Sequence, residues 1–166
     1  MIGNDVVDIL QSRVESNWQR PGFIHKLFTN NEQLLIADAP EAEIMVWLLW
    51  SMKEAAYKIY NRETKIREYI PKQLECKLLL KTNQYTNGIV ACKNKVYYTS
   101  SVVANNYVHT IAVGRFDDLD KVIDIENKSI IKNQYGIPYL LNAQNKLQDV
   151  SISHHGRIEK VVTLKS

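Results

Sequence analysis

The sequence contains no apolar run near the roughly eighteen residues that a membrane-spanning helix needs. The N-terminus, MIGNDVVDI, carries acids where a secretory signal would be basic and then apolar. There are only two cysteines, Cys76 and Cys92, which make neither a disulfide framework nor a cysteine metal site. We therefore expect a cytoplasmic protein with reduced cysteines and no membrane partner, although a single bridge between the two cysteines stays open.

The excess of positive over negative charge is small. Lysine and arginine number 21 against 18 acids, and this weak positive balance does not indicate nucleic acid as a partner. A mildly basic surface is compatible with an acidic protein partner or a phosphorylated ligand. The 166 residues show no internal repeat or low-complexity linker, so they suit one domain that can bury a sizeable core.

Apolar periodicity and turn residues predict an α+β fold in which antiparallel sheet predominates. We expect strands at residues 2–10, 74–81, 88–92, 95–103, 107–113, 150–153 and 159–164. We expect helices at 16–27 (interrupted at Pro21-Gly22), directly after Thr29, from Pro40 to about 62, and at 119–132. The helix after Thr29 has the spacing of a capping box, because Glu32 follows three residues later.

The most informative stretch is WSMKEAAYK at 50–58, within the longest predicted helix. Glu54 and Lys58 fall on one face of this helix, and a compact apolar arc falls on the other. Trp47, Trp50 and Tyr57 lie beside the charges, whereas an ordinary surface helix has a plain polar face. We expect something to cover this face and to place Glu54 in a cleft. The simpler interpretation is a helix-stabilising Glu–Lys pair worth about 0.2–0.5 kcal/mol.

The first predicted strand contributes a second acid. Strand alternation places Asp5 on the same face as Gly3 and Val7, and an Asp on an apolar face is costly to bury without a partner. A metal-binding role and an ordinary strand-end role are both compatible with this pattern. Asp8 falls on the other face of a regular strand, where it would meet solvent or cap a helix unless a bulge turns it inward.

A third candidate is SISHHGR at 151–157. Its serine hydroxyls, an imidazole and the Arg157 guanidinium are donors suited to an anion such as phosphate, and a β-turn with surface histidines is the plainer interpretation. A Ser-His-Asp hydrolase fits poorly because no Gly-x-Ser-x-Gly elbow is present. A zinc site is weak because His154 and His155 are adjacent and no cysteine pair supports them.

Together these motifs resemble the 4'-phosphopantetheinyl transferase superfamily. Residues 50–58 match the W-x-x-K-E-A-x-x-K signature of that family at every specified position. Residues 2–9 resemble the G-x-D-x-V-E-I element of holo-acyl-carrier-protein synthases, and residues 28–32 resemble the F-T-x-x-E motif. The stretches 135–139 and 151–157 resemble the G-K-P and S-x-S-H-x-G-R elements.

The order of these elements is similar to that of the short, single-domain acyl-carrier-protein synthases. Asp8, three positions after Asp5, agrees with this subgroup, because the longer type has its second acid where this chain has Val7. Yet residues 135–139 look more like the longer type, with Ile137 in place of the usual lysine. The resemblance implies one domain over residues 1–166, an antiparallel sheet packed with a long central helix, and an unassigned β-rich insertion at about 75–127.

The resemblance also implies an enzyme that transfers 4'-phosphopantetheine from coenzyme A to a serine of an apo acyl or peptidyl carrier protein, releasing adenosine 3',5'-bisphosphate. It implies Mg²⁺ held by Asp5 and Glu54, with Glu54 and Lys58 as catalytic residues. Either Glu54 or a water on the metal would take the serine proton. The residues expected to bind coenzyme A are Lys53, Lys58, Ser153, His154 and Arg157.

By the same resemblance we expect self-association, with a trimer favoured and the active site between neighbouring subunits. The carrier protein would be acidic. Gln11 stands where the short subgroup often has a docking arginine, which leaves carrier recognition open. Two alternatives remain: an inactive homologue that binds coenzyme A as a scaffold or regulator, and a small binding module unrelated to coenzyme A.

Overall fold

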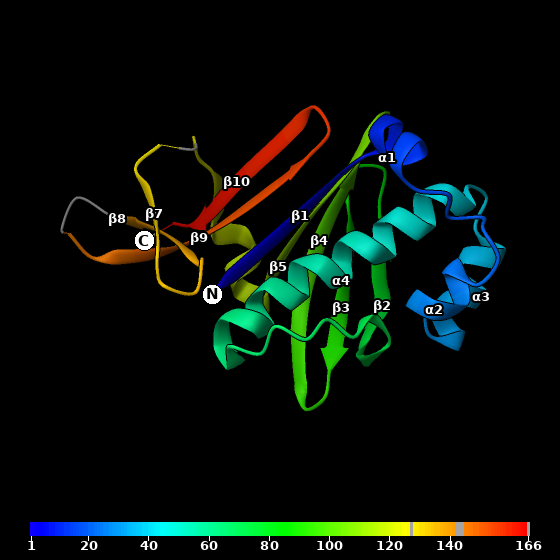
Figure 1. Cartoon of the computed structure of the whole chain (residues 1–166), viewed down its shortest axis with the longest axis horizontal. Helices are drawn as coiled ribbons and strands as arrows, with labels where there is room; N and C mark the ends of the chain where they lie inside the picture. The colour runs from blue at the N-terminus through cyan, green and yellow to red at the C-terminus, as the bar shows by residue number, and fades with distance from the viewer. Residues whose placement is uncertain (127, 142–144, 166) are drawn as a thin grey trace.

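The structure, a computed structural model, describes residues 1–126, 128–141 and 145–165. Within these residues it has two five-stranded sheets whose strand pairs are all antiparallel (Figure 1). The first sheet, in the order β1-β5-β4-β3-β2, consists of β1 (Ile2–Asp8), β5 (Tyr107–Val113), β4 (Lys95–Val103), β3 (Thr86–Cys92) and β2 (Leu74–Lys81). The second, in the order β6-β10-β9-β8-β7, consists of β6 (Val122–Asp124), β10 (Ile158–Leu164), β9 (Leu147–His155), β8 (Pro138–Leu141) and β7 (Ile130–Lys132).

The described helices gather around the first sheet. They are α1 (Ile9–Glu15), α2 (Phe23–Leu27), α3 (Asn30–Asp38) and α4 (Ala42–Thr64), with short 3-10 helices η1 (Pro71–Gln73) and η2 (Phe116–Lys121). The long helix α4 lies across one face of this sheet (Figure 1), which confirms the predicted α+β class with a long central helix. None of the helices in the described ranges is both long and apolar enough to span a bilayer.

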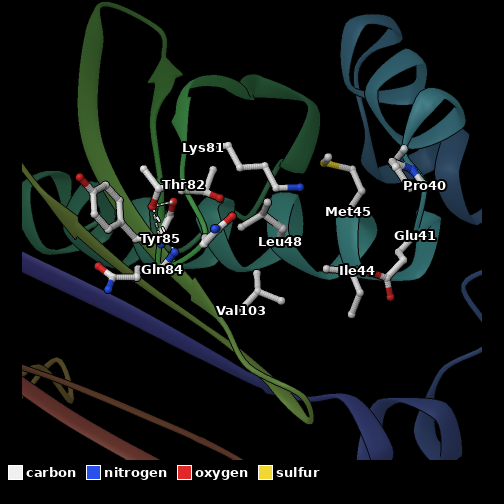
Figure 2. A pocket seen from close by; sticks show the side chains of 13 residues that line it. Pro40, Glu41, Ile44, Met45, Leu48, Lys81, Thr82, Gln84, Tyr85 and Val103 are labelled. Atoms are coloured by element: carbon white, nitrogen blue, oxygen red, sulfur yellow. Dashed lines mark hydrogen bonds between the residues drawn. The ribbon is translucent and has the colours of Figure 1, made fainter.

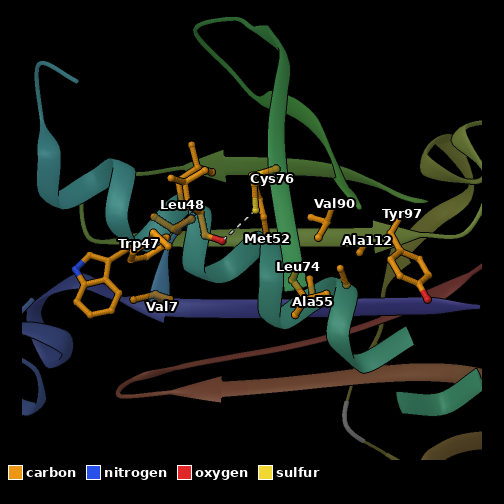
Figure 3. Close-up of a cluster of buried hydrophobic side chains, with 14 of the residues drawn as sticks. Val7, Trp47, Leu48, Met52, Ala55, Leu74, Cys76, Val90, Tyr97 and Ala112 are labelled. Atoms are coloured by element: carbon orange, nitrogen blue, oxygen red, sulfur yellow. Dashed lines mark hydrogen bonds between the residues drawn. The ribbon is translucent and has the colours of Figure 1, made fainter. Parts of the chain in front are cut away.

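The main core lies between α4 and the first sheet. Met52 and Ala55 of α4 are fully buried there against apolar strand side chains (Figure 3). Gly3 lets β1 approach the helix closely, because a Cβ at this position would lie 2.1 Å from the backbone oxygen of Ala55. This contact places Asp5 of β1 directly beside the helix that carries Glu54.

Strand β1 also connects the two sheets, because its free edge lies along β9. Side chains of β9 accept the β1 backbone N–H groups at every second residue: Asn4 N–H bonds Ser151 Oγ (2.8 Å), Val6 N–H bonds Ser153 Oγ (3.0 Å) and Asp8 N–H bonds His155 Nδ1 (2.9 Å). The Ser-x-Ser-x-His spacing of β9 thus matches the two-residue period of β1. A smaller core of Ile2, Val113 and Val162 fills the space between the sheets.

The predicted strands between residues 74 and 113 are confirmed, as is the capping box. The Thr29 side chain accepts the Glu32 N–H, and the Glu32 carboxylate accepts the Thr29 N–H at 2.8 Å. Cys76 and Cys92 are both buried and free, so the expectation of reduced cysteines is confirmed and they form no bridge.

One helix prediction is wrong and another is confirmed only in part. Residues 119–132 form the end of η2 and the strands β6 and β7, although residue 127 lies outside the described residues. Their Val122-Ile123 and Ile130-Ile131 pairs are β-branched and pair with β10 and β8.

The helix predicted at 16–27 is confirmed only after its predicted interruption at Pro21-Gly22, where α2 begins, and α1 ends before this range. Asp8 ends the first strand and caps α1, because its carboxylate accepts the N–H groups of Leu10 and Gln11.

Candidate active site

Asp5 and Glu54 line the same cavity, which has a volume of about 280 Å³. Asp5 lies in the middle of β1 and Glu54 in the middle of α4, so the glycine-dependent contact between these elements sets their approach. Apolar side chains and two histidines complete the cavity: Val6, Val7, Phe23, Leu27, Trp47, Trp50, His154 and His155, with Ser12 and Ser16. The structure therefore brings together the two acids that the sequence singled out.

The charge of Asp5 affects the protonation of Glu54. Burial, and then the nearby Asp5, raise the pKa of Glu54 from 4.5 to about 7, although Lys58 and Tyr69 act in the lowering direction. Burial also raises the pKa of Asp5, against Lys58 and a hydrogen bond that the Ser153 hydroxyl donates to Asp5 Oδ1 at 3.1 Å. A cation in this cavity would relieve the repulsion between the two acids.

Lys58 lies one helical turn after Glu54 and ties β1 to β9. Its ammonium group donates to the backbone oxygens of Asn4 (2.6 Å) and Ile152 (3.1 Å). Burial lowers the pKa of Lys58, while the charges of Asp5 and Glu54 raise it. Because an ammonium has three N–H donors, these two bonds leave one for a ligand.

Ser153 and His154 point to different sides of β9. The Ser153 hydroxyl accepts the Val6 N–H and donates to Asp5, so both bonds are made within the protein. His154 is exposed and lines both the Asp5–Glu54 cavity and a second cavity of about 410 Å³. Of Ser153 and His154, only His154 therefore faces the cavities, where it can meet a ligand.

The second cavity lies between α4, β9 and the β7–β8 hairpin. Lys58, Arg62 and Lys132 line it, and no carboxylate is among its described lining residues. Ile137 forms part of its wall. Lys132 lies directly across the β7–β8 pair from Pro138, so it supplies a positive charge next to Ile137.

The structure does not bring Lys53 to either cavity. Its side chain is 0% exposed and forms an ion pair of 2.7 Å with Glu32, which is equally buried. Lys53 also donates to the backbone oxygens of Pro71 (2.7 Å) and Leu74 (2.6 Å), while Glu32 accepts the Cys76 N–H (2.7 Å). All three Lys53 donors are therefore used inside the protein, where the pair satisfies backbone groups at the edge of β2.

Arg157 also has an internal partner. Its guanidinium group is exposed but binds the buried Asp8 carboxylate through Nε (2.9 Å) and a terminal nitrogen (3.1 Å). Hydrogen bonds from Arg157 hold the pKa of Asp8 well below its usual range. Neither residue lines the Asp5–Glu54 cavity, so Asp8 is a helix cap and not a third acid of the site.

The sequence is similar to a known protein family over much of its length. A sequence model of the 4'-phosphopantetheinyl transferase superfamily matches residues 1–112, more than half of the chain. The chain belongs to this superfamily. No curated protein matches the sequence. Among solved structures, the holo-[acyl-carrier-protein] synthase of Thermotoga maritima is similar at a TM-score of 0.48 and 10% identity, with 99% of this chain and 83% of that chain covered.

The superfamily match includes Asp5, Glu54 and Lys58 and ends before β9. Assignment to the superfamily thus depends on the half of the site that holds the carboxylates. The Ser-His strand is placed beside them by its contacts with β1.

Tyr69, next to the Asp5–Glu54 cavity, was not predicted from the sequence. Tyr69 packs edge-to-face against Trp50 and Tyr57, with ring centroids 5.8 and 4.8 Å apart, so it covers the aromatic face of α4 as expected. Burial and the charge of Glu54 raise the pKa of the Tyr69 hydroxyl above its usual range. The aromatic face indicated that a cover existed, but no local pattern identified the residue.

Other features of the described residues do not compete with this site. No group of three or more His, Cys, Asp or Glu side chains suited to a metal occurs in the part of the chain that the structure describes. Another cavity, of about 330 Å³, lies at the start of α4, where Ile44 and Leu48 face the turn between β2 and β3 (Figure 2). It contains none of the predicted site residues, and neither does a cavity of about 500 Å³ between α3 and the strands β2 and β3.

Proposed function

We propose that this protein transfers the 4'-phosphopantetheine group of coenzyme A to a serine of an apo acyl or peptidyl carrier protein. The observation that carries the proposal is the convergence of Asp5, Glu54 and Lys58 at one place in a chain of this superfamily. A pyrophosphate concentrates negative charge that an incoming oxygen must approach. Cations and ammonium groups stabilise that charge during phosphoryl transfer.

The donor set of the cavity fits Mg²⁺. This ion is usually held by one or two carboxylates, with waters and phosphate oxygens completing its coordination. Asp5 and Glu54 are two carboxylates at one cavity, and the charge of Asp5 contributes to the raised pKa of Glu54. When bound, Mg²⁺ would neutralise the charge of the pyrophosphate and of the leaving bisphosphate.

The chain's own residues would then handle orientation and the proton. The serine oxygen of the carrier bonds to the β-phosphorus as the bond from that phosphorus to the bridging oxygen breaks, and adenosine 3',5'-bisphosphate leaves. Either Glu54 or a water in the cavity would accept the serine proton, and a bound cation would lower the pKa of Glu54 below the value of about 7 that it has in the free protein. The third donor of Lys58 would stabilise charge on the leaving group, and Ser153 would hold Asp5 in place.

We assign coenzyme A to the second cavity together with the edge of the first. His154 lines both, and the positive charges of Lys58 and Lys132 suit the phosphates of this substrate. Lys53, Ser153 and Arg157 are left out of the proposed binding set because internal partners occupy them.

The proposed partner is an acidic carrier protein in the cytoplasm, and we keep a trimer as the proposed assembly. The trimer is carried over from the resemblance to the short acyl-carrier-protein synthases.

A direct experiment is to incubate the protein with coenzyme A, Mg²⁺ and a panel of apo carrier proteins, and to measure carrier mass. We expect a gain of one phosphopantetheine group, loss of turnover in Glu54→Gln with an unchanged circular dichroism spectrum, and full activity in Glu43→Gln as a matched α4 control. Calorimetric binding of coenzyme A without transfer to any carrier would favour the inactive homologue. An absence of binding would reject both functions, and an unchanged rate in Glu54→Gln would refute the metal assignment.

A further inference from the structure

Tyr69 occupies a special position relative to Glu54. Trp50, Glu54 and Tyr57 lie three and four residues apart on α4, so their side chains form one stripe along the helix. The ring of Tyr69 contacts both aromatic ends of that stripe, at interplanar angles of 76° and 72°. Two edge-to-face contacts fix the ring over the position of the carboxylate between them.

The hydroxyl group of Tyr69 is buried and makes no hydrogen bond of standard geometry within the described residues, yet it lies close enough to the Glu54 carboxylate to act on the pKa of that group. A buried hydroxyl without a full hydrogen bond destabilises the folded protein, so the position of the Tyr69 hydroxyl calls for an explanation. A phenol is a hydrogen-bond donor at neutral pH, and Glu54 is the carboxylate on the stripe that it covers. Hydrogen bonds at active sites are often long in the empty protein and shorten only in the loaded complex.

We infer that Tyr69 is a positioning residue, whose hydroxyl donates a hydrogen bond to the Glu54 carboxylate when a divalent cation occupies the Asp5–Glu54 cavity. One Glu54 oxygen would then be held by the phenol while the other binds the cation. Tyr69 is not among the residues that line the cavity, so it acts through Glu54 and does not contact the substrate. The inference rests on the proposed function only in its use of a divalent cation at this place.

The test measures cation binding without coenzyme A. Mn²⁺ is titrated calorimetrically into wild type, Tyr69→Phe and Tyr97→Phe. Tyr97 is the matched control because its hydroxyl also donates to an α4 carboxylate, that of Glu63 at 3.0 Å, outside the cavity. Partners that orient a metal ligand typically contribute 10–100-fold to affinity, so we expect Tyr69→Phe to bind Mn²⁺ about 10-fold more weakly and Tyr97→Phe to match wild type.

A double-mutant cycle separates this role from packing. In a Glu54→Gln background, Tyr69→Phe should cause no further loss of Mn²⁺ affinity, because the group it orients has been changed. Wild-type Mn²⁺ affinity in Tyr69→Phe, or an equal loss in both backgrounds, overturns the inference.

The outcomes also separate this inference from the proposed function. Transfer to a carrier with an unaltered Mn²⁺ affinity in Tyr69→Phe would remove the role of Tyr69 and leave the enzyme. A selective loss of Mn²⁺ affinity without transfer to any carrier would do the reverse. Absence of Mn²⁺ binding to wild type would overturn the inference and the metal assignment together.

Discussion

The pKa of Glu54 links the chemistry of the site to the stability of the fold. Burial and Asp5 raise this pKa from 4.5 to about 7, so the folded protein without a cation holds the proton more tightly than the unfolded chain does. The free energy of unfolding therefore falls as pH rises from about 4.5 through 7. A shift of this size corresponds to a loss on the order of 3 kcal/mol above pH 7.

We expect Glu54→Gln to be more stable than wild type at pH 8 in EDTA, on the order of 3 kcal/mol, and about equally stable at pH 4.5. The neutral amide removes the buried charge that forms only at high pH. Urea unfolding at both pH values measures the difference, with Glu43→Gln as control, because Glu43 lies in the first turn of α4, outside the cavity, and pairs with Arg13. Saturating Mg²⁺ should stabilise wild type at pH 8 but not Glu54→Gln. A constant difference between the two proteins from pH 4.5 to 8 would contradict the prediction.

At the scale of elements, the adjacent residues Lys53 and Glu54 point to different sides of α4. Neighbouring helix residues lie about 100° apart, so one of the pair can face the interior while the other faces a cavity. Lys53 connects α4 to α3 through Glu32 and to the edge of β2 through Leu74. Glu54 lines the cavity beside β1. Lys53 of the motif therefore holds α4 against its neighbours, while Glu54 supplies a carboxylate to the candidate site.

Lys53→Met should reduce the free energy of unfolding by about 3–5 kcal/mol, because it leaves the Glu32 carboxylate buried without its cation. Lys95→Met is the control, since Lys95 pairs with Glu63 at a partly exposed position, where such pairs contribute about 0–1 kcal/mol. Urea unfolding gives both values. If Lys53 instead held coenzyme A, Lys53→Met would weaken coenzyme A binding while leaving stability near that of Lys95→Met.

The elements that the sequence predicted well have strong local signals. Period-two alternation separated by Asn- and Gly-containing turns located β2 to β5, and Thr29 with Glu32 located the start of α3. The helix expected at 119–132 failed because the described strands β6 and β7 there are only three residues long, too short to show a period. Their β-branched pairs needed a partner strand to become interpretable.

The residues of the candidate site likewise differ in whether a local sequence pattern could identify them. Asp5, Glu54 and Lys58 could be found because each breaks or marks the periodicity of its own element. The internal partners of Lys53 and Arg157 could not be found, because Glu32 and Asp8 lie far away along the chain. A side chain's freedom to bind a ligand depends on contacts of that kind, which no local pattern contains.

At the scale of the whole molecule, residues far apart along the chain meet at the candidate site. Lys58 joins the backbones of Asn4 on β1 and Ile152 on β9, and Ser153 bonds Asp5 directly. We therefore predict that the residues of one chain suffice for transfer, so that a trimer would carry three complete sites.

Mixing two defective variants checks this arrangement. Glu54→Gln and His154→Ala, co-refolded in equal amounts, should transfer phosphopantetheine no faster than the average of the two variants measured alone. Each chain would carry one intact and one altered half of its own site. A mixture clearly faster than that average would mean that residues from two chains combine, and light scattering on the same samples would report the assembly.

The hydrogen bonds between β1 and β9 join residues 147 positions apart, such as Asn4 and Ser151. During synthesis the strand bearing Asp5 therefore emerges long before the strand that satisfies its amides. A nascent chain interrupted before β9 would already contain Asp5, Glu54 and Lys58, yet it would lack the Ser153 hydroxyl that holds Asp5 and the Ile152 oxygen that holds Lys58. Unfinished copies of the protein that lack β9 would therefore lack the hydrogen bonds that hold Asp5 and Lys58 in place, and we expect them to be inactive.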